Sequence, residues 1–161
     1  ANGIGNLAQR SLSMVAKNCG AAMPEIQPGG DAEAVLETAL VQHSKGYFSS
    51  MAALQLHRAL ENVMAMVAAA NLYFADSAPW ALAKTDPVRM AAVLATTLEA
   101  VRRIAILVQP VMPASSAALL DQLGVAADAR GFDALDVQVA AGTPLPAPAG
   151  VFPRWVEPKA G

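Results

Sequence analysis

Cysteine, aromatic residues and excess charge are all scarce in this sequence. Its single cysteine, Cys19, cannot form an internal disulfide, and one thiol with two histidines gives no recognisable spacing of metal ligands. Aromatic residues make up 5% of the 161 residues, and the formal net charge is −2. This near-neutral charge excludes a protein that binds polyanions through its overall field, so any contact with nucleic acid would be local and mostly non-Coulombic.

Segments for secretion or for membrane insertion are also missing. The N-terminal residues lack the charged region and the apolar run that make up a signal peptide. The most apolar predicted helix, residues 88–108, carries Arg89, Glu99, Arg102 and Arg103, so we expect no membrane span. With the lone cysteine, these absences favour a reducing, cytoplasmic setting.

Groups suited to catalysis are few. The carboxylates are scattered, and His43 and His57 have no Cys or Ser partner at a suggestive spacing. The pair Gly29-Gly30 precedes a predicted helix but lacks the rest of a phosphate-binding pattern. We therefore expect no catalytic residue, metal or cofactor in this chain.

Apolar residues recur at helical spacing through most of the chain. Hydrophobic residues make up 55% of it, which, with many Ala, Leu, Val and Met, favours helices packed on helices. We predict helices over residues 2–19, 31–46, 48–75, 86–108 and 113–123. Asp31 suits the start of the second helix as an N-cap, and Gly46 is interpreted as its end.

The third helix has an apolar stripe formed by Leu56, Leu60, Val63 and Val67. Their spacings of four, three and four predict a side that faces the core, and Asn71 continues this stripe as a polar residue. The helix over residues 86–108 repeats in the same way, and Asp86-Pro87 opens it in the favoured order of cap and then proline.

A corner is predicted where the third helix ends. Asp76 or Ser77 can cap a new short helix, and Pro79 suits its first turn. Trp80 follows, and its ring is either a core plug between two helices or a platform on which an unstacked base packs. Asn71, just before the corner, is of a type that more often ties such a turn internally than contacts a ligand.

A polar stripe along the first helix includes Asn6, Arg10 and Lys17. The simpler interpretation is a helix face in contact with solvent. The functional one is that Asn6 and Arg10 present an amide and a guanidinium side by side. Such groups can hydrogen-bond the edge of a base, and the guanidinium can also hold a phosphate.

Proline and glycine dominate residues 142–153, which predicts an extended segment that Phe152 and Trp155 anchor to the body. The fold predicted from these patterns is all-α. It is an up-and-down helical bundle of about five helices over residues 1–135, followed by an extended Pro/Gly-rich C-terminal tail over residues 136–161.

Four short segments resemble, in the same order, the anticodon-binding domain of bacterial methionyl-tRNA synthetase. They are residues 2–10 (NGIGNLAQR), residues 70–80 (ANLYFADSAPW) with Lys84 after them, residues 109–113 (QPVMP) and residues 151–155 (VFPRW). The related leucyl, valyl, isoleucyl and cysteinyl domains share the bundle but not the Asn-x-x-x-Arg and Ala-Pro-Trp pair. Phe74 and Ala75 depart from the family pattern, so Asp76 is not carried over as a contact.

This resemblance implies that Asn6, Arg10 and Trp80 read the CAU anticodon, chiefly its first base, cytosine. Cytosine would stack on Trp80 while Asn6 and Arg10 satisfy its pairing edge, and Pro79 would fix the corner that aims the ring. Asn71 and Lys17 are supporting candidates. The function implied is anticodon recognition within a methionine–tRNA ligase, which attaches methionine to its tRNA for translation.

The partners implied are a methionine tRNA and the catalytic domain of a parent chain. The His-Ile-Gly-His and Lys-Met-Ser-Lys-Ser motifs of that domain are absent here, as is a zinc-binding knuckle. ATP and methionine would then bind the catalytic domain, and this chain alone would be inactive; we expect a monomer. The alternative is a helical protein-interaction or scaffold domain, in which Trp80 is buried and the stripe of Asn6 and Arg10 only meets solvent.

Overall fold

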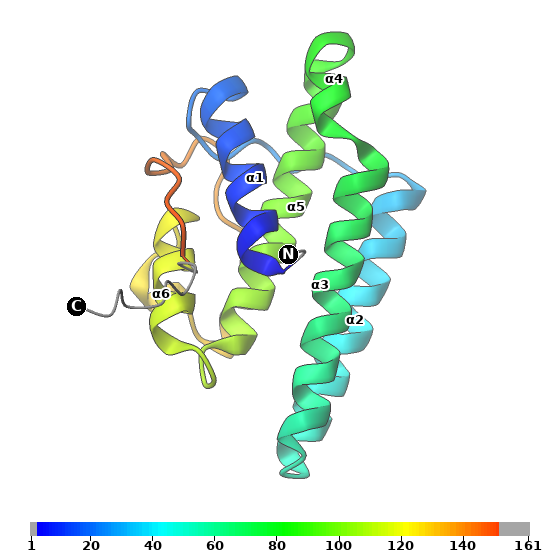
Figure 1. Cartoon of the computed structure of the whole chain (residues 1–161), viewed down its shortest axis with the longest axis vertical. Coiled ribbons are helices and arrows are strands. Elements are labelled where there is room, and N and C mark those ends of the chain that lie inside the picture. Colours follow the sequence, from blue (N-terminus) through cyan, green and yellow to red (C-terminus); the bar gives the residue numbers. More distant parts are fainter. Residues whose placement is uncertain (1–2, 152–161) are drawn as a thin grey trace, which may run out of the picture.

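The computed structural model describes residues 3–151, which form a bundle of helices (Figure 1). The α-helices are α1 (Ile4–Asn18), α2 (Asp31–Ala52), α3 (Leu56–Ser77), α4 (Pro79–Thr85), α5 (Pro87–Val108) and α6 (Pro113–Gln122). Two short 3-10 helices follow, η1 (Ala127–Ala129) and η2 (Phe132–Ala134). The predicted all-α bundle is confirmed, with five longer helices and the short α4 after the corner.

Helix α5 lies at the centre of the bundle, with α1, α3, α4 and α6 packed around it (Figure 1). Its predicted apolar stripe, from Met90 to Val108, is buried along its whole length. Because α5 is covered on nearly every side, its buried charges need partners. Arg102 Nε and Nη2 donate to the Glu99 carboxylate at 2.8 and 2.6 Å. Arg102 also donates to the carbonyl oxygen of Ala134 at 2.9 Å, which ties η2 to α5.

The predicted end of α2 at Gly46 is wrong, because the helix continues to Ala52. A Cβ on Gly46 would lie only 2.4 Å from Oδ1 of Asn62, so the glycine lets α2 and α3 approach closely instead of ending the helix. The turn between the helices comes later, where Leu54 adopts a left-handed backbone with φ of 57°. Figure 1 shows α2 and α3 as a long hairpin that extends beyond the other helices.

The N-terminal caps of α2 and α5 can be compared with the caps that the sequence predicts. Gly30, and not Asp31, precedes α2, and its backbone N–H donates to Oε2 of Glu33 at 2.8 Å. At the start of α5 the predicted cap is confirmed, since Oδ1 of Asp86 accepts a hydrogen bond from the backbone N–H of Arg89 at 2.9 Å. A carboxylate therefore satisfies a free N–H group at both helix starts.

Residues 136–151 are mostly extended and return to the body of the bundle. Leu145 is buried, and its backbone N–H donates to the carbonyl oxygen of Ala21 at 2.8 Å, close to the loop between α1 and α2. The anchors predicted at Phe152 and Trp155 lie outside the described residues. The division of the chain at residue 135 stays a prediction.

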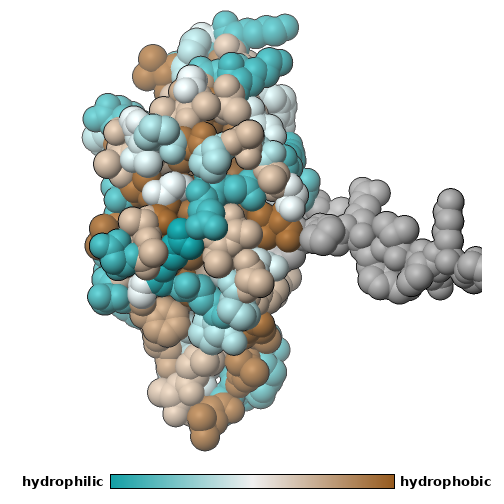
Figure 2. Space-filling view, turned by 90° about the vertical axis from the view of Figure 1, so that its left-hand side faces the viewer, coloured by the Kyte–Doolittle hydropathy of each residue, from teal (hydrophilic) through white to brown (hydrophobic). Residues whose placement is uncertain are grey.

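The surface of the bundle has an apolar end. Figure 2 shows hydrophobic side chains gathered at the lower tip of the molecule, which is the turn of the α2–α3 hairpin in Figure 1. Leu54 is 92% exposed there and Leu56 is 50% exposed, so the first residue of the predicted stripe is not in the core. None of the described helices combines the length and the hydropathy that crossing a bilayer requires.

Candidate nucleic-acid interface

The corner between α3 and α4 carries Trp80 and is formed by the backbone of Ala78. This residue adopts a left-handed conformation, with φ of 43° and ψ of 57°, and Pro79 then begins α4 as predicted. The side-chain cap predicted at Asp76 or Ser77 is wrong, since no side chain caps α4. The left-handed backbone of Ala78 ends α3 and redirects the chain. A helix can end in this way without a hydrogen bond from a polar side chain.

Trp80 lies on the surface, although Phe74 beneath it is in the core. The Trp80 residue is 48% exposed and Phe74 is 1% exposed. Their ring centroids are 5.7 Å apart with an angle of 59° between the planes. Phe74 therefore fills the core beneath the corner, and the interpretation of Trp80 as a core plug is wrong.

Arg10 of α1 lies against both rings. Its guanidinium carbon is 5.0 Å from the centroid of Phe74 and 5.3 Å from that of Trp80, within the range of a cation–π contact. Within residues 3–151, Arg10 takes part in none of the ion pairs. The structure thus brings together two residues that the sequence singled out, and leaves an exposed cation beside an exposed aromatic ring.

Asn6 and Lys17 occupy the same helix at different distances from this cluster. Asn6 is exposed and lies four residues before Arg10, so the two residues are on one face of α1. Lys17 is also exposed, but it lies seven residues after Arg10, roughly 10 Å further along the helix axis. Asn6 shares a helix face with Arg10 one turn away, and Lys17 lies two turns from it.

Asn71 is half-buried on α3. Its side-chain Nδ2 donates to the backbone carbonyl oxygen of Val67 at 2.9 Å, so the amide bonds within its own helix. The role predicted for Asn71 at the corner stays a prediction.

A partly buried hydrogen-bond network holds the end of α3 that carries Phe74. The hydroxyl of Tyr73 donates to Oε1 of Glu33 on α2, and Nη2 of Arg89 on α5 donates to the same oxygen at 2.6 Å. Burial and the bond to Glu33 raise the pKa of Tyr73 to about 12. Burial alone would raise the pKa of Glu33, but the hydrogen bonds from Tyr73 and Arg89 outweigh it and leave that pKa lowered.

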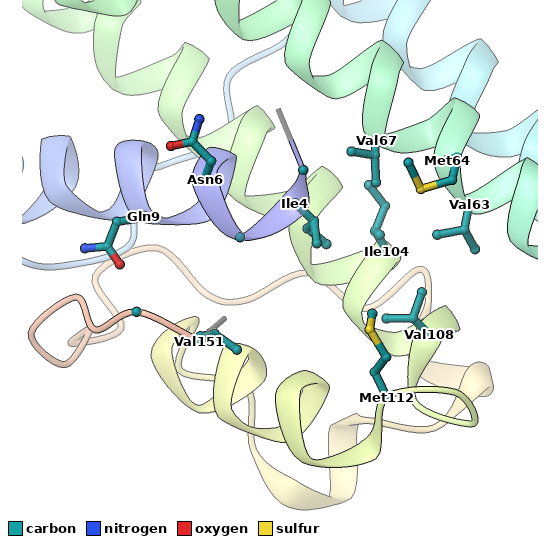
Figure 3. A pocket seen from close by; sticks show the side chains of 13 residues that line it. Ile4, Asn6, Gln9, Val63, Met64, Val67, Ile104, Val108, Met112 and Val151 are labelled. Atoms are coloured by element: carbon teal, nitrogen blue, oxygen red, sulfur yellow. The ribbon is translucent and has the colours of Figure 1, made fainter. Parts of the chain in front are cut away.

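Asn6 also lines a cavity of about 690 Å³ between α1, α3 and α5, to which Met112 and residues 150–151 contribute as well (Figure 3). Its apolar walls include Ile4, Val63, Met64, Val67, Val108 and Met112. In Figure 3 the amides of Asn6 and Gln9 project to opposite sides of α1. The walls offer no acid, base or nucleophile, and no cluster of three metal-ligating side chains exists within the described part of the chain.

Phe74 is the site residue that sequence reasoning missed. The predicted stripe of α3 runs from Val67 to Asn71, whereas the buried residues that follow Val67 are Ala70, Tyr73 and Phe74. Val63, Val67, Ala70 and Phe74 are again spaced by four, three and four, so this signal is present in the sequence.

Comparison with known proteins identifies the family of this chain. The family model described as the anticodon binding domain of methionyl tRNA ligase matches residues 23–158, a range that includes Asn71, Pro79 and Trp80 but not α1. The methionine–tRNA ligase of Mesorhizobium japonicum is 52% identical over 159 residues, which cover 98% of this chain and 31% of that protein. That of Mycobacterium tuberculosis is 45% identical over 166 residues, which cover 99% and 31%.

A solved structure shows the same fold. The crystal structure of the apo form of Mycobacterium tuberculosis methionyl-tRNA synthetase matches with a TM-score of 0.92 at 42% identity. The match covers 96% of this chain and 32% of that one. The chain therefore spans about a third of the length of the proteins that it resembles.

Proposed function

Because the chain belongs to the family of anticodon-binding domains of methionyl-tRNA ligase, we propose that it reads the CAU anticodon of a methionine tRNA through Asn6, Arg10 and Trp80. The observation that carries this proposal is the contact of Arg10 with a half-exposed Trp80. The domain works in the cytoplasm as part of a monomeric ligase that joins methionine to its tRNA. ATP and methionine bind the catalytic domain of that ligase.

Stacking on Trp80 is the first part of the proposed recognition. Arg10 and Phe74 contact the indole, yet 48% of the residue remains open to solvent. The first anticodon base, cytosine, leaves its own stack and packs on this open surface. A base on an aromatic side chain contributes about 1–3 kcal/mol to binding, and this contribution needs no positive field, which suits a chain with a net charge of −2.

Hydrogen bonds to the base edge supply the discrimination. The Arg10 guanidinium donates N–H groups to the N3 and O2 acceptors of cytosine, and the Asn6 amide oxygen accepts from its amino group. A purine or a uracil in the same place leaves donors or acceptors without partners. Since an unpaired polar group in a closed contact costs about 1–3 kcal/mol, a few such bonds separate cytosine from the other bases.

A fluorescence titration with anticodon stem-loops tests the proposal. The sequence has two tryptophans, so Trp155→Phe leaves Trp80 as the reporter. We expect a stem-loop with CAU to quench its emission, and a stem-loop with GAU to bind at least tenfold more weakly. An equal response to the two loops, or no response to either at millimolar RNA, contradicts anticodon reading by this site.

The alternative function, a scaffold domain, predicts a different structure at this corner. It requires Trp80 inside the core and Arg10 in contact with solvent alone. The indole is half-exposed and the guanidinium lies on it, so the observed arrangement favours a ligand site at this corner.

A further inference from the structure

We propose that Phe74 is a positioning residue for anticodon recognition, which holds the Arg10 guanidinium beside Trp80 before the tRNA arrives. The inference rests on the proposed function of Arg10 and Trp80. It adds Phe74 as a fourth residue beside Asn6, Arg10 and Trp80, one that makes no contact with the base itself and acts through Arg10 and Trp80.

The three groups form a nearly equilateral triangle. The guanidinium carbon of Arg10 is 5.0 Å from the Phe74 ring and 5.3 Å from the Trp80 ring, and the two rings are 5.7 Å apart. The rings are tilted by 59°, so they form a notch in which one cation contacts both faces. A guanidinium held by two rings has far fewer orientations than one held by a single ring.

Phe74 is the fixed member of the triangle. It is 1% exposed, whereas Arg10 and Trp80 are both exposed at the surface. The preceding residue, Tyr73, is bonded to Glu33, and Glu33 is bonded to Arg89 on α5, so this end of α3 is held from two sides. The position of the Phe74 ring is therefore set by the core and does not depend on a ligand.

The contact with Phe74 sets the position of the Arg10 guanidinium when the base binds. Residues 3–151 offer no ion-pair partner to Arg10 that could hold it elsewhere. Without Phe74 its remaining ring contact is Trp80, the ring on which the base also packs. With Phe74 present, the guanidinium keeps one aromatic contact throughout, and its N–H groups stay directed to the base edge at a smaller entropic cost.

Two variants and their combination test the role of Phe74. Phe74→Leu keeps the site apolar but removes the aromatic ring, and Arg10→Met removes the group that the ring holds. Binding is measured by fluorescence anisotropy of a labelled CAU stem-loop, since the Trp80 emission itself will change. We expect Phe74→Leu to weaken binding about five- to twentyfold, and to have less than a twofold effect when Arg10→Met is already present.

The controls separate positioning from stability. Leu120→Ala removes a fully buried side chain from α6, away from the corner, and should destabilise the fold without changing the affinity of the folded protein. Equal effects of Phe74→Leu with and without Arg10 would overturn the positioning role. If Arg10→Met and Trp80→Ala leave CAU binding unchanged, the proposed function itself fails, which is a distinguishable result.

A measurement on the unaltered protein avoids any question of folding. Ring currents should shift the Arg10 side-chain proton resonances upfield, because its guanidinium lies over two aromatic faces. In NMR spectra of the free domain we expect these resonances to stand apart from those of exposed arginines such as Arg58. Arg10 resonances at ordinary positions would show that the triangle does not persist in solution, and would overturn the proposal.

Discussion

The Arg10 guanidinium carbon lies 5.3 Å from the Trp80 ring centroid, a contact that joins the first helix to the corner after the third. Lysine at this position would keep the charge but lose the planar group that packs on aromatic faces. We expect Arg10→Lys to weaken CAU stem-loop binding about tenfold, or ~1.4 kcal/mol, with little change in stability because Arg10 is exposed. Anisotropy titrations and urea unfolding measure the two quantities.

Lys17→Ala is the matched control for this prediction, since it removes a charge from the same helix away from the rings. We expect less than a twofold effect on binding. If the two substitutions weaken binding equally, the role of Arg10 is a general attraction to phosphate and not a contact at the ring.

Because α2 and α3 approach closely at Gly46, we expect the effect of Gly46→Ala on stability to depend on the side chain of Asn62. The Asn62 side chain is held in place by His43 at 2.9 Å and by the carbonyl oxygen of Arg58 at 2.9 Å, so it cannot easily make room for a Cβ. We expect Gly46→Ala to lower the free energy of unfolding by about 1–3 kcal/mol. In an Asn62→Ala background the same change should be neutral or stabilising by up to ~1 kcal/mol, because alanine is the better helix former.

Urea unfolding of the four proteins in this cycle provides the comparison. A cost of Gly46→Ala that is the same with and without the Asn62 side chain would refute the steric explanation.

Tyr73 predicts a loss of stability at alkaline pH. Its pKa is raised from 10.0 to about 12 in the folded protein, so its contribution is complete below pH 10 and is lost as the pH rises through about 12. Two pH units correspond to about 3 kcal/mol. We expect the unfolding free energy of the wild type to fall more steeply between pH 10 and 12 than that of Tyr73→Phe, which has no hydroxyl to ionise.

The difference between the free energies of unfolding of the two proteins is the quantity to compare, because all their other titratable groups are the same. Thermal unfolding followed by circular dichroism over this pH range supplies it. Parallel curves for wild type and variant would mean that neither burial nor the bond to Glu33 raises the pKa of Tyr73 in the folded protein.

We expect a substitution of Arg102 to lower the free energy of unfolding more than a substitution of any other charged residue, because Arg102 is 1% exposed. Arg102→Met would remove the side-chain donor from the carbonyl oxygen of Leu135 and one of the two donors to that of Ala134, and it would leave Glu99 with one partner fewer. Removing one partner of a buried pair costs about 3–5 kcal/mol. Chemical denaturation should show this loss.

Glu37→Gln is the comparison for Arg102, since Glu37 is half-exposed and its pair with Arg103 lies at the surface. An exposed pair contributes about 0–1 kcal/mol. A loss for Arg102→Met as small as that for Glu37→Gln would show that the buried pair adds little to stability.

Local signals predicted most of the helices correctly. The apolar repeat of α5 and its Asp86-Pro87 start depend on residues a few positions apart, and both are present in the structure. The predicted helix end at Gly46 is wrong because the role of this glycine depends on Asn62 in another helix. In a sequence, a glycine that ends a helix cannot be distinguished from one that allows a second helix to approach closely. The cap at the corner failed for a similar reason, since the backbone of Ala78 makes the turn.

By itself, the sequence determined the helical class, the periodicity of the buried faces and the identities of Asn6, Arg10 and Trp80 as candidates, because each depends on residue type and short spacing. Only the tertiary structure decided that Arg10 and Trp80 meet, that Trp80 is exposed and that Phe74 lies beneath both. These facts depend on how α1, α3 and α4 pack around α5. Packing is set by the summed fit of many side chains, and no local pattern in the chain encodes it.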